Sequence, residues 1–485
     1  MRYILDERYR LHGWRKLPTA LYDTKKKRPM FFPKDRFLQL MYCDGAHELD
    51  ETQLTEEEKK FIEVSASAGV IRRAGFAEFL KPEQSYRVFP GEYRRQAHWS
   101  LTGACNLQCR HCFMSAPNAK HGSPSLSQLL NIVDQLAECG VFQVALTGGE
   151  PLIRPDFLNV VDALNRREIG IDVIFTNGWL VDEILLDELD KRNVHPPFQL
   201  SFDGVGWHDF LRGVPGAEER TIRALKLLQE REHPVSVSMC MHRKNRHVLR
   251  ESVRLLASLG VRSVKCGTMM ELGEWAKPEM QELQLSDEEE LEMFEEYIPQ
   301  YFEDDAPVSI MLGGMFMYTP GESEWKIFNR KVCSAEEETR MPSCGVLQRT
   351  FYIGAEGMVC PCMGMADCSG APHFPNLFET PLRDILGDSE FTRLCSATVG
   401  EVRDRSGKCR DCRFVDRCTG GCRNAALLAG DNYYGVDPDL CRFFENDGEA
   451  RITAAAQEPF AAYIRRHPPA ETSLRPVTDD APDCP

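Results

Sequence analysis

The sequence predicts an α/β protein whose central part is a partial (β/α)6 barrel of the TIM type. Across residues 95–325, short runs rich in β-branched residues alternate with amphipathic helical patterns, which is typical of a parallel sheet. At 485 residues the chain is too long for one core. We therefore expect a small N-terminal domain (1–88), a cysteine-rich domain (326–448), and a C-terminal helix with a disordered tail (449–485).

Six strands are expected in the central part, at residues 97–102, 142–147, 171–176, 198–203, 235–241 and 262–267. Between them, residues 126–139 and 217–230 carry apolar side chains at three- and four-residue spacing, which predicts helices. Six units are too few for a closed eight-fold barrel. The site of such a fold is expected at the C-terminal ends of its strands.

Residues 1–88 have the pattern of a small mixed domain. Residues 18–30 predict two strands joined by a turn that carries the basic run Lys25 to Arg28, and residues 34–43 and 55–68 predict helices. Thr55 and Glu58 match a capping box at the start of the second helix. Asp44-Gly45 predicts a turn, and a further strand is expected from Val70.

The charge and the cysteine content narrow the classes of function. The net charge of −16 argues against a nucleic-acid partner, because an acidic surface repels the phosphate backbone. The start of the chain is charged and resembles no secretion signal, and no run of about 18 apolar residues predicts a membrane span. We therefore expect a cytoplasmic protein, in which 19 cysteines indicate metal sites rather than disulfides.

Three cysteines follow the first expected strand of the barrel. Cys105, Cys109 and Cys112 form a C-x3-C-x2-C pattern. Structural zinc normally takes four ligands, so zinc would need a distant fourth one. An iron–sulfur cubane held by three cysteines instead keeps one iron open for another ligand.

This spacing resembles that of the radical S-adenosylmethionine (SAM) superfamily. The resemblance implies that Cys105, Cys109 and Cys112 hold a 4Fe–4S cluster that cleaves SAM to a 5′-deoxyadenosyl radical. Further motifs resemble the family's cofactor contacts at strand ends: Gly148, Gly149, Glu150 and Pro151, then Thr176 and Asn177, then Ser201 and Asp203. Arg212 resembles the arginine that pairs with the SAM carboxylate, and an exposed surface salt bridge is the alternative.

The C-terminal cysteines resemble the seven-cysteine SPASM domain, which holds two auxiliary 4Fe–4S clusters. The resemblance assigns Cys409, Cys412, Cys418 and Cys441 to the outer cluster, and Cys344, Cys362 and Cys422 to the inner one. Cys333 is the candidate for the fourth inner ligand, and Cys360 competes for that position. Cys368 remains unassigned, and zinc is the alternative metal. The other six cysteines are expected to be inert thiols: Cys43, Cys139, Cys240, Cys266, Cys395 and Cys484.

The order of elements in residues 1–88 resembles the winged-helix, PqqD-like domain that binds leader peptides in many peptide-modifying radical SAM enzymes. The combined resemblance implies a maturase of a ribosomally made precursor peptide, with flavodoxin or ferredoxin as electron donor. A sulfur-to-carbon thioether cross-link, as in sactipeptide or ranthipeptide maturases, is the first hypothesis. Carbon–carbon or carbon–oxygen cross-linking, epimerisation, formylglycine formation on a sulfatase and a non-catalytic leader-binding scaffold stay open. No general base stands out among His98, His111, Glu271, Glu274 and Asp367.

Overall fold

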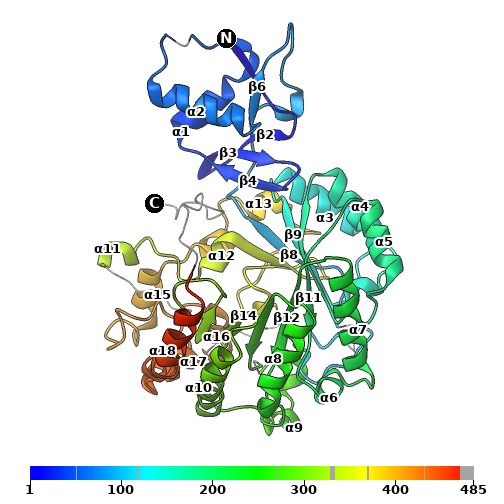
Figure 1. Ribbon diagram of the computed structural model, residues 1–485, viewed down its shortest axis with the longest axis vertical. Helices are drawn as coiled ribbons and strands as arrows, with labels where there is room; N and C mark the ends of the chain where they lie inside the picture. Colours follow the sequence, from blue (N-terminus) through cyan, green and yellow to red (C-terminus); the bar gives the residue numbers. More distant parts are fainter. Residues whose placement is uncertain are drawn as a thin grey trace.

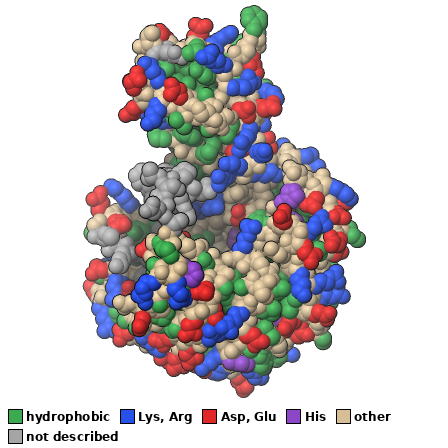
Figure 2. All heavy atoms as spheres, viewed as in Figure 1, with side chains coloured by type: hydrophobic (Ala, Val, Ile, Leu, Met, Phe, Trp, Pro, Cys, Tyr) green, Lys and Arg blue, Asp and Glu red, His purple; other side chains and the backbone are tan. Residues whose placement is uncertain are grey.

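The computed structural model describes residues 1–469 apart from residues 51, 117–119, 270, 328–333, 367, 369–370 and 431. A small N-terminal unit projects from a larger α/β body (Figure 1). On the face seen in Figure 2 the two parts meet at a waist, and acidic and basic side chains are mixed. No helix among the described residues has the length and apolar character that crossing a membrane requires.

The six predicted barrel strands are confirmed, and they lie side by side in chain order, all parallel. They are β8 (Gln96–Ser100), β9 (Gln143–Thr147), β10 (Gly170–Thr176), β11 (Phe198–Ser201), β12 (Val235–Cys240) and β13 (Ser263–Gly267). Apolar side chains on the outer side of this sheet pack against the helices, as expected for a parallel sheet.

Four short strands extend the sheet beyond the prediction. β14 (Ser309–Leu312) runs parallel to β13 and is followed by antiparallel β15 (Phe316–Tyr318). At the other edge, β16 (Thr350–Ile353) runs parallel to β8 and pairs with antiparallel β17 (Val359–Cys360). Because β16 and β17 come from the cysteine-rich region, that region is joined to the barrel through one continuous ten-stranded sheet.

Helices cover the outside of the curved sheet (Figure 1). The two helices expected at 126–139 and 217–230 are confirmed as α3 (Leu126–Glu138) and α7 (Ala217–Glu230). The others around the barrel are α4 (Phe157–Arg166), α5 (Glu183–Lys191), α6 (His208–Arg212), α8 (Leu249–Ser258), α9 (Pro278–Gln281) and α10 (Asp287–Glu303). A C-terminal helix, α18 (Gly448–Arg466), packs on α10 through Phe460 and Tyr463, which both contact Phe302.

The cysteine-rich region is mostly short helices and loops. The helices are α11 (Ala335–Glu338), α12 (Gly345–Arg349), α13 (Leu382–Ile385), α14 (Glu390–Cys395), α15 (Val399–Ser406), α16 (Arg423–Gly430) and α17 (Pro438–Glu445). Weak periodicity in the sequence is explained by these lengths, since helices of one or two turns leave no repeating apolar stripe.

The described residues of the N-terminal unit form two mainly antiparallel sheets and two α-helices. One sheet has the order β5-β1-β6 and the other β4-β3-β2-β7. The elements are β1 (Arg2–Leu5), β2 (Tyr9–Trp14), β3 (Leu17–Asp23), β4 (Arg28–Phe31), α1 (Lys34–Met41), β5 (Asp44–Glu48), α2 (Glu56–Ser67), β6 (Ile71–Arg73) and β7 (Arg87–Val88). The capping box of Thr55 and Glu58 is confirmed. The predicted turn at Asp44-Gly45 is wrong in extent: Gly45 has a positive φ, but the segment continues as β5, paired with β1.

Aromatic side chains attach this unit to the barrel. Trp14, Tyr22 and Phe89 form a buried cluster with Phe142, the residue before β9. The Trp14 indole also donates to the carbonyl of Cys139 (3.2 Å), and the Tyr22 hydroxyl donates to the carbonyl of Glu168 (2.7 Å). Phe142 and Glu168 precede β9 and β10, so the N-terminal unit is docked at the end of the barrel opposite the strand C-termini.

Candidate functional site

The loop that follows β8 carries Cys105, Cys109 and Cys112, and the glycines after β9 pack directly against it. The N–H of Gly149 donates to the Thr102 carbonyl (2.7 Å), and that of Glu150 to the Ala104 carbonyl (2.9 Å). A Cβ on Gly149 would lie 2.1 Å from the Ala104 oxygen, a distance that no side chain tolerates. The glycines therefore allow the cysteine loop to approach closely, and their expected contact with the cofactor stays a prediction.

Loops from two other strand ends hold the same loop. The N–H of Arg110 donates to the Leu211 carbonyl in α6 (2.8 Å), which follows β11. After β13, the N–H of Glu274 donates to the Cys112 carbonyl (2.9 Å). The cysteine loop is therefore fixed by segments that follow β9, β11 and β13, at the barrel mouth that the sequence predicted.

The three thiols of this loop have the chemistry of cluster ligands. N–H groups of Leu107 and Ala116 point at the sulfurs of Cys105 (3.4 Å) and Cys112 (3.3 Å). Burial, together with the Glu150 carboxylate and the two other cysteines, raises the pKa of Cys105 to about 12. Thiols that resist ionisation in this way become thiolates when a metal centre binds them, so this donor set fits an iron–sulfur cluster.

Glu150 joins the ends of two neighbouring strands. Its fully buried carboxylate accepts hydrogen bonds from the N–H of Leu152 (3.1 Å), the hydroxyl of Thr176 (2.9 Å) and the N–H of Asn177 (2.8 Å). Burial raises the pKa of Glu150 to about 7. The side chain of Asn177 donates in turn to that of Asn106, in the cysteine loop (2.8 Å). The predicted contact of Glu150 with the cofactor stays a prediction, and its hydrogen bonds show that it also holds the strand ends in position.

Arg212 and Asp203 form a buried ion pair. The guanidinium bonds the carboxylate at 2.8 Å and 3.0 Å, and its third nitrogen lies 3.7 Å from the Cys109 sulfur. Although burial acts in the opposite direction, Arg212 holds the pKa of Asp203 well below its usual range. The alternative of an exposed salt bridge is wrong, because both side chains are buried. The expected contact between Arg212 and the SAM carboxylate stays a prediction.

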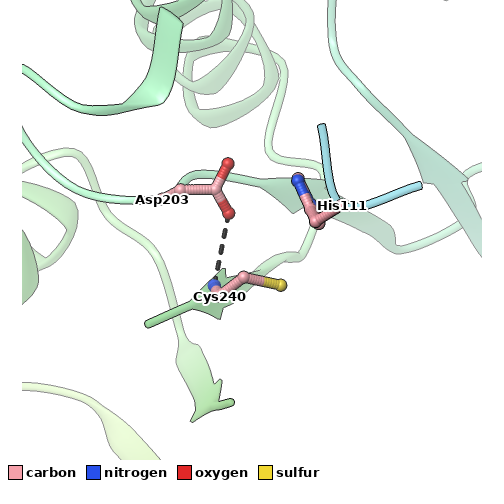
Figure 3. Close-up of side chains that lie close together, drawn as sticks. All are labelled: His111, Asp203 and Cys240. Atoms are coloured by element: carbon pink, nitrogen blue, oxygen red, sulfur yellow. Dashed lines mark hydrogen bonds between the residues drawn. The ribbon is translucent and has the colours of Figure 1, made fainter. Parts of the chain in front are cut away.

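His111 and Cys240 lie close to Asp203 of this pair, and the three residues come from separate segments (Figure 3). The Cys240 N–H donates to the Asp203 carboxylate (3.2 Å), and burial raises the pKa of the Cys240 thiol to about 12. Both carboxylate oxygens already bond the Arg212 guanidinium, so the group does not fit a further metal ion. Cys240 nevertheless lies at the barrel mouth, close to the cysteine loop. Its position at the end of a predicted strand could have indicated this location. By contrast, Cys43, Cys139, Cys266 and Cys395 are buried in apolar surroundings, which agrees with the expected inert thiols, and Cys484 lies outside the described residues.

A polar row lines the inside of the barrel. The register places Ser201, Ser238 and Lys265 side by side on β11, β12 and β13. Lys265 is exposed although it lies on a central strand, and its ammonium acts electrostatically on His98, which lies on β8. Four strands separate β8 from β13, so this effect acts across the inner side of the curved sheet and not between neighbouring strands. Because Val264 and Cys266 on either side of it are buried in the core, Lys265 lies on the opposite, inner face of the sheet, which borders the barrel lumen. The sequence reasoning missed this feature.

The cysteine-rich region brings its thiols into two groups. Cys409, Cys412 and Cys441 all act on the thiol of Cys418, whose pKa burial and these neighbours raise to about 11. In the second group, Cys362 interacts with both Cys344 and Cys422. The grouping follows the predicted ligand sets, and the assignment of each cysteine to a cluster stays a prediction.

Lys265 connects the second group to the lumen. Burial raises the pKa of the Cys362 thiol, and the Lys265 ammonium opposes this effect. The same ammonium acts on Cys240, which lies beside the loop of Cys109. The Lys265 ammonium therefore acts both on a thiol of the second group and on a thiol beside the cysteine loop.

Comparison with known families agrees with this arrangement. The model of the radical SAM superfamily matches residues 99–256, and the SPASM model, described as an iron–sulfur cluster-binding domain, matches residues 344–413. The chain contains a radical SAM domain and a SPASM domain. The radical SAM domain binds SAM and a 4Fe–4S cluster, and the SPASM domain binds auxiliary iron–sulfur clusters.

Relatives of known activity span most of the chain. The AdoMet-dependent heme synthase of Methanosarcina barkeri is 26% identical over 70% of this chain and 94% of its own length. The PqqA peptide cyclase of Granulibacter bethesdensis is 26% identical over 68% of this chain and 83% of its own. Among solved structures, Streptococcus suis SuiB bound to the precursor peptide SuiA superimposes with a TM-score of 0.62, covering 91% of this chain and 100% of SuiB at 16% identity. That likeness supports the fold.

Two further thiols of the SPASM domain are buried. Cys368 contacts the side-chain oxygen of Asn424 (3.2 Å) and the Gly364 carbonyl (3.3 Å), and Cys360 is fully buried in the same apolar cluster. This environment agrees with a structural thiol in each case.

Two other candidate residues, Cys333 as the fourth ligand and Asp367 as a base, lie outside the described residues. Glu274, one candidate base, is paired with Lys277, which lowers its pKa and makes it a weak base.

Proposed function

We propose that this enzyme modifies a ribosomally synthesised precursor peptide and forms an intramolecular thioether cross-link. The observation that carries the proposal is the position of Lys265, whose ammonium acts electrostatically both on Cys240, beside the cysteine loop, and on Cys362 of the SPASM domain. We therefore place the substrate in the barrel lumen beside Lys265. A peptide residue in that lumen is within reach of both the site where radical chemistry begins and the SPASM domain. The PqqA peptide cyclase supports a peptide substrate, because the similarity covers 68% of this chain and 83% of the cyclase.

Residues of this chain would hold the cofactors and orient the peptide in the lumen. When bound, the clusters and SAM supply a 5′-deoxyadenosyl radical for hydrogen abstraction and an acceptor for the remaining electron. We propose that Cys105, Cys109 and Cys112 hold the SAM cluster, with Arg212 and the Glu150 network fixing their loop. Cys344, Cys362 and Cys422 would hold the inner auxiliary cluster, and Cys409, Cys412, Cys418 and Cys441 the outer one. Lys265 would orient a carbonyl or carboxylate of the peptide by a charge-assisted hydrogen bond.

We further propose that residues 1–88 bind the leader of the precursor. Both sheets of this unit end in edge strands, to which an extended peptide can add by main-chain hydrogen bonds. The basic turn is not simply a solvated hairpin: Lys27 donates to the Asn165 side chain in α4 (2.6 Å). Lys27 therefore contributes to the contact between this unit and the barrel. We propose that Lys25 and Lys26 bind acidic side chains of the leader.

Carbon–carbon cyclisation is the second candidate, since the relative that acts on PqqA is a peptide cyclase. Coexpression of the enzyme with a short peptide encoded beside its gene, followed by tandem mass spectrometry, tests both. Loss of two hydrogen atoms with a linkage at cysteine sulfur supports the thioether. The same loss with a carbon linkage favours the cyclase.

Other results would overturn the proposal. An unchanged mass with deuterium incorporated from heavy water indicates an epimerase. Normal turnover of a sulfatase-derived peptide by a variant lacking residues 1–88 favours a formylglycine-forming enzyme. If the reduced, reconstituted protein released no 5′-deoxyadenosine from SAM, a non-catalytic scaffold would remain.

A further inference from the structure

Three potential metal ligands meet at the end of the barrel opposite the mouth. Asp190 lies in α5, His195 precedes β11, and His233 precedes β12. One potential ligand atom of each residue lies within 4.8 Å of the other two. Neither the radical chemistry nor the proposed leader binding uses this cluster.

His233 is arranged as a metal-ligating histidine. Only 3% of the residue is exposed, and its Nδ1 is 3.1 Å from the Pro196 carbonyl, to which it donates. That bond places the proton on Nδ1 and leaves a lone pair on Nε2, which is buried and has no hydrogen-bond partner. A histidine that binds a metal through one ring nitrogen commonly donates the other N–H to a carbonyl in this way. An unsatisfied buried nitrogen is costly, and a bound cation would remove that cost.

The other two ligand atoms are already close to the spacing that one ion requires. His195 Nδ1 lies 3.2 Å from a carboxylate oxygen of Asp190. Two ligand atoms each about 2.1 Å from a tetrahedral ion lie roughly 3.4 Å apart, so both can bind the same ion with little movement. The His195 side chain is 57% exposed, which leaves room for water in a fourth position.

The surrounding charge favours a cation. Arg231 is the nearby guanidinium, and it bonds three carboxylates, those of Glu183 (2.7 Å), Asp187 (2.8 Å) and Asp190 (2.5 Å). Three negative charges therefore face one positive charge. Arg231 lowers the pKa of Asp190, and burial lowers that of His233, so the carboxylate is ionised and the imidazole neutral, as ligands must be.

We propose that Asp190, His195 and His233 bind one zinc-class divalent transition-metal ion. Two histidines and one carboxylate suit such an ion. The ion would link α5 to the loops before β11 and β12, which are neighbouring strands. The role of the ion is structural, because the site lies at the end of the barrel away from the cysteine loop.

Titration with ZnCl2 in a calorimeter tests the proposal, using tag-free full-length enzyme loaded with its iron–sulfur clusters under anaerobic conditions. The wild type is compared with His195→Ala, which removes an exposed side chain and leaves the core intact. His47→Ala is a matched control, since His47 is also 57% exposed and lies 2.8 Å from the Asp44 carboxylate. We expect one Zn²⁺ site in the wild type and in His47→Ala, and at least about tenfold weaker binding in His195→Ala.

Thermal unfolding gives a second readout of the same site. Zn²⁺ should raise the Tm of the wild type and of His47→Ala, and raise that of His195→Ala much less. Equal Zn²⁺ affinity of the wild type and His195→Ala would overturn the proposal. So would a wild type that binds no Zn²⁺ beyond what His195→Ala binds.

Discussion

Lys265 is the residue that connects the two halves of the proposed active site. Its ammonium acts on His98, Cys240 and Cys362, which come from β8, β12 and the SPASM domain. Its side chain is exposed although it lies on a central strand. A lysine placed this way is available to a substrate.

Replacing Lys265 by Met tests this role, because Met keeps the length of the side chain and removes the charge. A hydrogen bond to a charged group contributes about 1.5–3 kcal/mol, so kcat/KM for peptide modification should fall roughly 10- to 150-fold. Iron content and SAM cleavage without peptide should be unchanged. Lys226→Met, at an exposed position of α7, is the control. An unchanged kcat/KM in Lys265→Met would show that the ammonium does not bind substrate.

Arg212 illustrates which part of the site the sequence could predict. Its place after the fourth barrel strand indicated the mouth, and the structure puts it there. Its partner could not be predicted, since the ion pair with Asp203 depends on how α6 folds back over β11. Lys265 gave no signal at all, because a single lysine in a strand looks like an exposed outer position until the curvature of the sheet is known.

At the scale of elements, the contact between the cysteine loop and the Gly148–Gly149 turn decides whether the SAM cluster can assemble. Gly149→Ala would force a methyl group against the Ala104 carbonyl and displace the loop. We expect about four fewer irons per chain after anaerobic reconstitution, with the SPASM clusters retained. Gly430→Ala is the control, because its Cβ meets no atom within 4 Å. Full iron content in Gly149→Ala would contradict this role of the turn.

The elements differ in how well the sequence predicted them. β8 to β13 and helices α3 and α7 carry clear periodicity and were predicted within a few residues. β16 is four residues long and pairs with β8, about 250 residues away in sequence, through a non-local contact that no local pattern encodes. For the same reason, the connection between the SPASM domain and the barrel emerged only from the structure.

At the scale of the whole molecule, an aromatic cluster is the main apolar contact between the N-terminal unit and the barrel. Trp14→Ala removes the largest side chain of that cluster and should cost about 3–5 kcal/mol. We expect limited proteolysis to release residues 1–88 faster, while iron content stays the same. Phe76→Ala, at a position that is 98% exposed, should leave the cleavage rate unchanged. Equal protection of Trp14→Ala and the wild type would show that other contacts hold the unit.

This docking position sets a minimum length for the substrate. The N-terminal unit lies before β9 and β10, whereas the cysteine loop lies beyond their other ends. β10 has seven residues, so a peptide running past it must span roughly 23 Å, or at least about seven extended residues. Precursor variants with shorter spacers between leader and modified residue should bind the enzyme but remain unmodified in mass spectra. Efficient modification with a spacer of three residues or fewer would contradict the leader-binding role of residues 1–88.

Deuterium transfer tests the central claim most directly. The precursor peptide is synthesised with deuterium on the carbon that becomes cross-linked, and is incubated with cluster-loaded enzyme, SAM and reductant. If the lumen hosts hydrogen abstraction from the peptide, 5′-deoxyadenosine should carry the deuterium in proportion to cross-linked product. Cross-linked peptide accompanied by unlabelled 5′-deoxyadenosine would contradict the account.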